Sequence, residues 1–347
     1  MDSIISKLID THSLAVEEYE SLLNNITDEK KEILKNEAVK LATSVYGKDI
    51  YARGLIEFSN YCKNDCYYCG IRNGNKNCER YRLTKEQIYD CCDIGYELGF
   101  RTFVLQSGED LYFNDDLMVE IISHIRNKFK DCAITLSIGE KEKSTYKKYF
   151  DAGANRYLLR HETANVELYK KIHPASMSFE NRMRCLQDLR DIGFQVGAGY
   201  MVECPYQTNY DLALDLKFIE EFKPEMCGIG PFIPHKDTDY RNEKAGTLEK
   251  TLLLLSITRI IVPDVLLPAT TALGTINPLG RELGVQHGAN VVMPNLSPTE
   301  VRSKYLLYDN KICTGDEAAE CKNCMSGRMK KIGYNLVIDR GDCKRTS

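Results

Sequence analysis

The chain has 347 residues, 43% of them apolar, so it can bury one large hydrophobic core or two ordinary ones. Acidic and basic residues nearly balance at a net charge of −4, which excludes a general electrostatic attraction to nucleic acid or to an anionic membrane. The longest apolar stretch, residues 252–267, is interrupted by Arg259, Pro263 and Asp264, so we expect no membrane span.

Cysteine is the unusual component, with fourteen residues. The N-terminal segment lacks the basic region and long apolar core of a secretory signal, so we expect a cytoplasmic protein whose cysteines are thiols. Their number therefore calls for a chemical explanation other than disulfide bonding.

Residues 1–48 predict helices that pack on the rest of the chain. Apolar residues recur there at helical spacing, Thr27 and Asp28 offer a helix start, and Gly47 ends the segment. After it the pattern changes to short β-rich runs, each followed by a stretch of helical length. We expect eight strands, at residues 51–58, 102–107, 133–138, 156–162, 195–202, 226–232, 265–272 and 290–295.

Eight strands that alternate with helices are typical of a parallel (βα)8 TIM barrel, an α/β fold whose active site lies at the C-terminal ends of the strands. Two doubly wound domains are the alternative, which the absence of a Pro/Gly/Ser-rich linker disfavours. We therefore expect N-terminal helices at 1–48, a barrel at 49–310 and a short cysteine-containing extension at 311–347.

Alternation along the predicted strands places polar residues together, because residues two apart point the same way. Thr135 and Ser137 share one face of the third run, and Arg160 and Glu162 share a face opposite His161 in the fourth. A polar cavity inside the barrel follows, although any single residue could instead lie at the solvent rim.

Three thiols follow the first predicted strand, at Cys62, Cys66 and Cys69. This close spacing suits three ligands on one side of a [4Fe–4S] cluster whose fourth iron has no protein ligand and stays open to a small molecule. A structural zinc site is the alternative, although such sites prefer four protein ligands.

The pattern Cys-x3-Cys-x-aromatic-Cys, with Tyr68 at the aromatic position, resembles the radical S-adenosylmethionine (SAM) superfamily. The resemblance implies that SAM binds the open iron and that an electron from an external donor cleaves it to a 5′-deoxyadenosyl radical. Ser107, Gly108 and Glu109 resemble the Gly-Gly-Glu segment that receives the SAM amino group. The other implied SAM-binding residues are Tyr68, Ser137, Glu162 and Arg182. No catalytic acid or base is implied.

Longer segments resemble the HydE family, the radical SAM maturases of [FeFe]-hydrogenase. They are residues 56–60, 105–110, 156–165, 228–235 and 268–271. Biotin synthase carries Asn-His-Asn where this chain has Arg160-His161-Glu162, which argues against that relative.

The HydE resemblance implies a substrate and two partners. The substrate would be an iron–cysteine complex with carbonyl and cyanide ligands supplied by the maturase HydG, and the diiron product would pass to the scaffold maturase HydF. The implied substrate-binding residues are Arg160, Thr270, Thr271, Met293 and Tyr308. A guanidinium such as that of Arg160 suits a carboxylate, and an ion pair with Glu162 is its alternative role.

One segment departs from the family, which usually reads Met-Val-Gly-Leu-Pro-Gly-Gln-Thr. Here Glu203 and Tyr206 occupy the two glycine positions. Since glycine reaches backbone conformations that other residues avoid, we expect an altered loop near SAM.

A second triplet, Cys313, Cys321 and Cys324, matches the positions of an accessory iron–sulfur cluster ([2Fe–2S] or [4Fe–4S]) that some HydE proteins carry. Zinc or free thiols are the alternatives, and Cys343 is a conceivable fourth ligand. The remaining cysteines have no cluster spacing and are expected to be mostly small buried residues.

Two other functions stay open from the sequence. One is a related radical SAM enzyme of the methylornithine synthase or biotin synthase type, in which Arg160 would grip the carboxylate of an amino-acid-like substrate. The other is an iron–sulfur carrier or a zinc-stabilised scaffold, which would bind metal without cleaving SAM.

Overall fold

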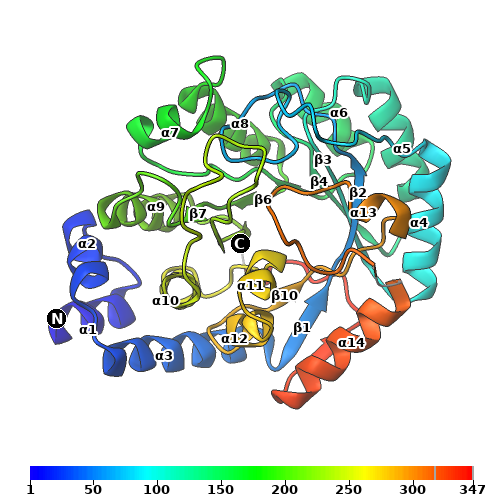
Figure 1. Ribbon diagram of the computed structural model, residues 1–347. Helices are drawn as coiled ribbons and strands as arrows, with labels where there is room; N and C mark the ends of the chain where they lie inside the picture. The colour runs from blue at the N-terminus through cyan, green and yellow to red at the C-terminus, as the bar shows by residue number, and fades with distance from the viewer. Residues whose placement is uncertain (316–317, 346–347) are drawn as a thin grey trace.

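The computed structural model describes residues 1–315 and 318–345, and it is a ring of parallel strands surrounded by helices (Figure 1). Isolated bridges close the ring, joining Met226 to Leu266, Pro268 to Val291 and Asn295 to Leu55. The predicted (βα)8 barrel is confirmed. Six neighbouring strands form one parallel sheet: β2 (Gly54–Ser59), β3 (Thr102–Ser107), β4 (Ala133–Ser137), β5 (Arg156–Leu158), β6 (Gln195–Ala198) and β8 (Met226–Cys227).

The first expected strand is divided in two, so its prediction as one strand was wrong. β1 (Asp49–Ala52) lies between β10 (Val291–Val292) and β11 (Asn335–Val337), whereas β2 pairs with β3. Arg53 separates them, and its buried guanidinium lies 2.9 Å from the sulfur of Met226. Gly54 follows, packed where a Cβ would stand 2.3 Å from Leu296 Cδ1. The strand is therefore interrupted at Arg53, between a segment paired to β10 and β11 and one paired to β3.

Other expected strands are also shorter or broken in the structure. The run 195–202 becomes β6 and β7 (Met201–Val202), and the run 226–232 becomes β8 and β9 (Gly230–Pro231), with β7 paired to β9. Gly199 has φ +148°, and a Cβ there would lie 2.1 Å from the carbonyl oxygen of Gly228. The run 156–162 keeps only β5 and a bridge at Glu162, whose φ is +67°. The run 265–272 contributes bridges alone, at Leu266 and Pro268.

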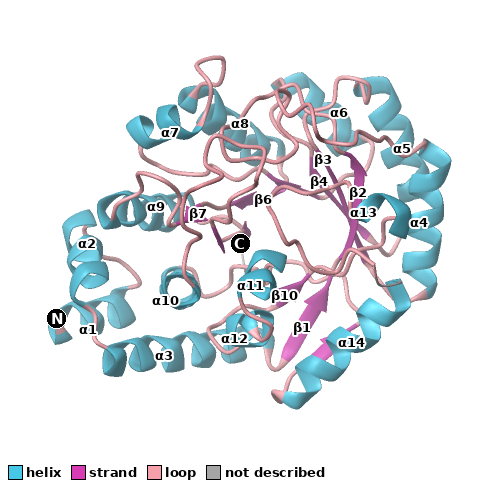
Figure 2. Ribbon diagram, in the orientation of Figure 1, coloured by secondary structure: helices cyan, strands magenta, loops and turns pink. Residues whose placement is uncertain are grey.

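Helices cover the outside of the ring (Figure 2). Several begin at a side-chain cap that accepts a hydrogen bond from the first turn, as at Thr84, Asn114 and Thr247. The helices are α4 (Lys85–Glu97), α5 (Asp115–Lys128), α6 (Lys143–Asp151), α7 (Val166–Ile172), α8 (Phe179–Ile192), α9 (Asn209–Phe222), α10 (Leu248–Ile261), α11 (Thr271–Ile276), α12 (Gly280–Val285) and α13 (Thr299–Arg302).

The apolar stretch noted in the sequence begins within α10, which is buried from Thr251 to its end. In the described residues, no helix has both the length and the apolar character needed to span a membrane.

The N-terminal segment forms α1 (Asp2–Thr11), α2 (Val16–Asn25) and α3 (Asp28–Tyr46), with α2 against α9 and α3 against α10. The carboxylate of Glu220 on α9 joins them, because it accepts from the hydroxyls of Ser13 and Tyr19 at 2.7 and 2.8 Å. Thr27 stands at the start of α3, but its hydroxyl makes no capping hydrogen bond. Gly47 ends the helix with φ +65°.

The C-terminal segment covers the end of the barrel where the strands begin. After α14 (Ala318–Lys331), β11 pairs with β1, and residues 338–345 run past the first residues of several strands. The buried Arg156, which opens β5, donates to the carboxylate of Asp342 at 2.6 Å, to the carbonyl of Arg340 at 2.7 Å and to the hydroxyl of Thr102 at 3.1 Å. The tail therefore supplies the acceptors that the buried cation needs.

The ion pair between the tail and Arg156 gives a testable pH dependence. Burial alone would raise the pKa of the Asp342 carboxyl, but Arg156 and Arg340 outweigh it and lower this pKa to about 2. Because the pKa is lower in the folded state, the charge stabilises the fold above about pH 4, and the contribution is lost as the pH falls toward about 2.

We expect Asp342→Asn to lower the free energy of unfolding by about 1 kcal/mol at pH 7, a figure reduced for solvent screening because the carboxylate is partly exposed. Denaturant unfolding followed by circular dichroism at several pH values measures the difference, which should shrink below pH 4. Asp28→Asn, at an exposed helix pair with Lys31, is the control and should change the free energy of unfolding much less than Asp342→Asn does. A difference for Asp342→Asn that persists unchanged at low pH would contradict the charge argument.

Candidate active site

The first cysteine triplet lies on the loop after β2, at the end of the barrel where the strands finish. Cys62, Cys66 and Cys69 are all part-buried. The loop turns sharply, since the N–H of Cys69 donates to the carbonyl of Cys66 at 3.2 Å. The structure therefore brings the predicted ligands onto one short loop at the mouth of the barrel.

Arg80 fixes this loop, although the sequence did not single it out. Its guanidinium donates to the carbonyls of Asn60, Ile71 and Arg72 at 2.5, 2.8 and 2.6 Å. Backbone carbonyls as partners leave no pattern in the sequence. A basic residue soon after a cysteine loop was the only available signal.

Burial raises the pKa of all three thiols, and the neighbouring cysteines add to the rise at Cys66 and Cys69. The pKa of Cys69 reaches about 12. Three thiolates in this position therefore require a nearby positive charge. A coordinated metal ion would supply that charge and would favour the deprotonated form of each thiol it binds.

Tyr68 turns inward from the same loop. Its ring meets His173 edge-on with the centroids 5.5 Å apart, and its hydroxyl lies 3.1 Å from Nε2 of that histidine. Nδ1 of His173 lies 3.0 Å from the carbonyl of Tyr169, and burial lowers the pKa of His173 to about 3. Because a carbonyl only accepts, the neutral ring carries its proton on Nδ1, and Tyr68 donates to Nε2.

The segment after β3 packs directly on the cysteine loop. A Cβ on Gly108 would lie 2.2 Å from the carbonyl oxygen of Tyr61, so only glycine fits there. The N–H of Glu109 lies 3.4 Å from the sulfur of Cys62. The hydroxyl of Ser107, which stands where the family has glycine, donates to the carbonyl of Gly108 at 2.6 Å.

The two carboxylates of this segment already have partners. Glu109 lies 3.0 Å from the ammonium of Lys63 and accepts from the N–H of Glu140 at 3.0 Å. Asp110 receives both a 2.7 Å and a 2.9 Å hydrogen bond from Arg82. A SAM amino group at Glu109 would share that carboxylate with Lys63.

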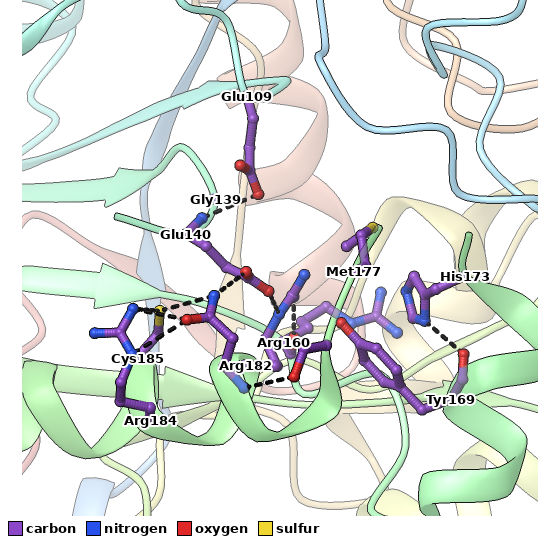
Figure 3. Close-up of polar contacts among 12 residues, drawn as sticks. Glu109, Gly139, Glu140, Arg160, Tyr169, His173, Met177, Arg182, Arg184 and Cys185 are labelled. Carbon is purple, nitrogen blue, oxygen red and sulfur yellow. Dashed lines mark hydrogen bonds and ion pairs between the residues drawn. The ribbon is translucent and has the colours of Figure 1, made fainter. Parts of the chain in front are cut away.

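Arg182 lies in a polar chain that crosses from β4 to α8. Glu140 stands between Glu109 and Arg182, whose Nε donates to its carboxylate at 2.5 Å (Figure 3). The Nη1 of Arg182 donates to the carbonyl of Arg160 at 2.7 Å. The sequence missed Glu140, which fixes the predicted SAM residue Arg182 in place.

Arg160 and Glu162 follow β5 and carry polar atoms without hydrogen-bond partners. Nη2 of Arg160 lies 3.2 Å from Oε2 of Glu162, so the ion pair considered for Arg160 is present. Neither these two atoms nor Nε of Arg160 makes a hydrogen bond, and all three are buried. Ser137, half-buried at the end of β4, reaches the same rim beside Gln106. Since buried polar groups normally have partners, the unpaired atoms indicate a place for a polar ligand.

Arg160 and Thr270 flank the short segment between β8 and β9. A Cβ on Gly228 would stand 3.9 Å from Cδ of Arg160, and one on Gly230 would stand 3.2 Å from Oγ1 of Thr270. The Thr270 hydroxyl also accepts from a backbone N–H in the first turn of α11, at 3.4 Å, and Thr271 is the first residue of that helix.

The other two predicted substrate residues have different surroundings. Met293 packs with a cluster that contains Met226, whereas the part-buried Tyr308 lies near Thr275 and Cys313. The predicted substrate residues are thus brought together only in part.

A buried ion pair inside the barrel was not foreseen. Lys311 donates to the carboxylate of Glu57 on β2 at 2.5 Å and to the carbonyl of Tyr305 at 2.9 Å. Asn295 donates to the other oxygen of Glu57 at 2.9 Å, and Gln106 lies 3.4 Å from the hydroxyl of Tyr305. The segment after the barrel thus reaches into its interior. A lone Glu57 in an apolar strand was the one sequence signal for it.

The altered loop after β7 keeps the backbone that glycine would allow. Glu203 has φ +56° and Tyr206 has φ +69°, both left-handed values. The Glu203 carboxylate accepts from the N–H and the hydroxyl of Thr247 at 2.6 Å each, at the start of α10. Both residues thus adopt a backbone conformation that glycine reaches readily, and the contacts of Glu203 offset part of the strain.

The second triplet is only partly described. Cys313 is part-buried, with φ +62° and its sulfur 3.7 Å from Nη2 of Arg281, while Cys324 is exposed on α14. Both lie near Arg328. The side chain of Cys321 lies outside what the structure describes.

Cys343 does not join these residues. Its thiol donates to the carbonyl of Asp264 at 3.2 Å and packs near Tyr46 at the closed end of the barrel, so the idea of a fourth ligand was wrong. Most of the other cysteines are buried as expected, namely Cys91, Cys92, Cys132, Cys185, Cys204 and Cys227, whereas Cys78 is part-buried.

Known proteins resemble this chain in sequence and in fold. Residues 56–218 match the radical SAM superfamily. A HydE subunit of the [FeFe]-hydrogenase maturase from Thermotoga maritima is 46% identical over 89% of this chain and 90% of that protein. A 3-methylornithine synthase from Methanosarcina acetivorans is 28% identical over 88% of this chain and 87% of that protein.

Solved structures agree with this relationship. The crystal structure of methylornithine synthase (PylB) superposes with a TM-score of 0.83 at 26% identity and covers 96% of this chain and 97% of its own. That of the maturase HydG has a TM-score of 0.80 at 22% identity, covers 96% of this chain and 74% of its own, and shows the shared fold.

The barrel, with its cysteine loop, is that of a radical SAM enzyme, a class that works with a [4Fe–4S] cluster and SAM. Within that class, the chain belongs to the HydE family of [FeFe]-hydrogenase maturases. The resemblance seen in the sequence is thereby confirmed.

The loop after β7 gives a stability prediction. We expect Glu203→Ala to lower the free energy of unfolding by about 2 kcal/mol, because it removes both contacts to Thr247 and keeps a side chain in the left-handed region. Glu203→Gly loses the same contacts but relieves about 1 kcal/mol of that strain, so it should be the more stable variant. Denaturant unfolding of both variants measures the order. Equal stability, or the reverse order, would contradict the strain argument.

Proposed function

We propose that the chain binds a [4Fe–4S] cluster through Cys62, Cys66 and Cys69 and cleaves SAM in the maturation of an [FeFe]-hydrogenase. One observation carries the proposal: three part-buried thiols share the open end of the barrel with the unpaired polar atoms of Arg160 and Glu162. Thiols suit iron, and unpaired polar atoms suit a polar cofactor beside it.

The number of thiols on the loop supports a cluster over a single structural zinc ion. Ligands of one zinc ion all lie about 2.3 Å from it when they are thiolates, whereas cysteines of a cube bind separate irons. Structural zinc sites use four protein ligands, whereas the cysteine loop offers three thiols. The donor set therefore fits the cluster better than the zinc alternative.

Several residues would hold SAM beside the cluster. Gly108 leaves room for close approach, and Glu109 would accept from the amino group. The other proposed contacts are Tyr68, Ser107, Ser137, Glu162 and Arg182. When both cofactors are bound, an electron from an external donor passes through the cluster and splits SAM to a 5′-deoxyadenosyl radical. The protein's own task is to orient SAM and to exclude water. The cysteine loop held by Arg80 would serve this at one end of the barrel, and the tail bound to Arg156 at the other.

We propose as substrate an iron–cysteine complex with carbonyl and cyanide ligands, supplied by HydG, with the diiron product passed to HydF in the cytoplasm. Arg160 would bind the cysteine carboxylate, since a guanidinium offers two parallel donors. Thr270, Thr271, Met293 and Tyr308 would line the remainder of the site.

The likeness to 3-methylornithine synthase supports a second candidate, in which Arg160 grips an amino-acid carboxylate instead. Incubation of the reduced enzyme and SAM with the HydG product, or with free amino acids, separates the two. Consumption of SAM that depends on the iron complex favours the maturase, and dependence on an amino acid favours the second candidate.

Removing one thiol tests the cluster. We expect Cys66→Ala to lower the rate of 5′-deoxyadenosine formation at least a thousandfold in an anaerobic assay with dithionite and SAM, because a cube held by two cysteines is lost. Chromatography of the products measures the nucleoside. Cys78→Ala, which removes another part-buried thiol, should retain wild-type activity. Activity in the Cys66 variant would show that the triplet does not hold the cluster.

The second triplet gives a separate outcome. We expect Cys324→Ser to lower the iron content per chain by the two to four atoms of an accessory cluster, while 5′-deoxyadenosine formation stays within twofold of wild type. Iron analysis of reconstituted protein measures the first quantity. Unchanged iron would remove the accessory cluster from the proposal.

A further inference from the structure

A buried histidine and aspartate lie directly behind the two residues that carry unpaired polar atoms. His161, between Arg160 and Glu162, is fully buried, as is Asp215 on α9. Nε2 of His161 lies 3.2 Å from Oδ1 of Asp215. The imidazole packs against Phe218, with ring centroids 4.5 Å apart, and against Tyr200 at 5.7 Å. The strand end is thus tied to the helix that covers it.

The hydrogen bonds fix the protonation of the imidazole. The N–H of Gly199 donates to Nδ1 of His161 at 3.2 Å, so Nδ1 is an acceptor and the proton is on Nε2. Burial lowers the pKa of His161 to about 3, which keeps the ring neutral. His161 therefore accepts from the end of β6 and donates to α9, joining two elements through one side chain.

Asp215 binds the turn at two points. Its Oδ1 also accepts from the N–H of Ala164 at 2.6 Å, two residues beyond Glu162. Its Oδ2 is buried and has no hydrogen-bond partner. Burial raises the pKa of this carboxyl well above its usual range.

The turn that these contacts hold is strained. Glu162 has φ +67°, a conformation that costs a side-chain-bearing residue about 1 kcal/mol. Its N–H donates to the carbonyl of Gly199 at 3.0 Å, so β6 holds it from the other side. The side chains of Arg160 and Glu162 meet at 3.2 Å, whereas His161 between them contacts α9, so fixing His161 against the helix also fixes the turn that carries the other two.

We propose that His161 and Asp215 are positioning residues that hold Arg160 and Glu162 in the geometry that binds SAM and substrate. The inference rests on the proposed function only for the identity of SAM. Both side chains are fully buried and hydrogen-bond only to protein groups, so they act through the residues beside them.

Asp215→Ala and Asp215→Asn test the pair. The alanine removes both hydrogen bonds, whereas asparagine keeps an acceptor at Oδ1 and places its amide where Oδ2 has no partner. We expect the alanine variant to bind SAM at least tenfold more weakly by calorimetry of the reconstituted enzyme, and asparagine to restore affinity within threefold. In the cofactor-free protein, hydrogen exchange at the Ala164 amide should be at least tenfold faster in the alanine variant only.

Asp211→Ala is the matched control. Asp211 is a buried carboxylate one turn earlier on α9, where it accepts from the side chain of Asn165 at 2.5 Å and does not touch residues 160–162. It should lower the melting temperature and leave SAM affinity within twofold of wild type.

The outcomes separate the inference from the proposed function. If the wild-type enzyme binds no SAM, the proposed function fails. The exchange experiment still tests the contacts of His161 and Asp215 with the turn, which we call the His161–Asp215 clamp. If wild type binds SAM and Asp215→Ala binds it equally well, the positioning role is wrong. Equal weakening by Asp211→Ala would reduce the effect to general destabilisation, and failure of asparagine to rescue would overturn the hydrogen-bond geometry.

Discussion

The site depends on the cost of burying polar groups that the protein itself does not pair. Two atoms of Arg160 and one oxygen of Glu162 are buried without hydrogen bonds at the end of the barrel where three part-buried thiols with raised pKa values lie. Such groups cost free energy when they are left alone in a folded chain. A cluster and a zwitterionic cofactor would pair with these groups, so binding them would remove the cost of burial.

Segments far apart in the sequence pack against both ends of the barrel. Below, the tail places Asp342 and the carbonyl of Arg340 on the buried Arg156. Above, Arg80 binds the carbonyls of the cysteine loop, and Lys311 reaches inward to Glu57. In each case a long cationic side chain from one segment satisfies acceptors of another, so the closure depends on contacts between residues far apart in sequence.

The backbone at the rim is strained where the site needs it. Glu162, Glu203 and Tyr206 all have left-handed φ values, and none of them is glycine. Compensating contacts lie close by: the Asp215 clamp behind Glu162, and the Thr247 contact of Glu203. Strain of this kind persists only where the surrounding structure fixes it, and it is commonly found at functional sites. At Glu203 and Tyr206 the backbone is therefore left-handed although neither residue is glycine.

The sequence by itself determined the barrel and the cysteine loop, because strand and helix periodicity and the spacing of Cys62, Cys66 and Cys69 are local properties, and the resemblance of longer segments indicated the family. It also placed Arg160 and Glu162 on one face, since alternation needs no tertiary information. Only the tertiary structure decided the break at Arg53, the tail below the barrel and the His161–Asp215 clamp. Each of these joins residues more than fifty positions apart, or a side chain to a distant carbonyl, and such pairings leave no periodic trace in a single sequence.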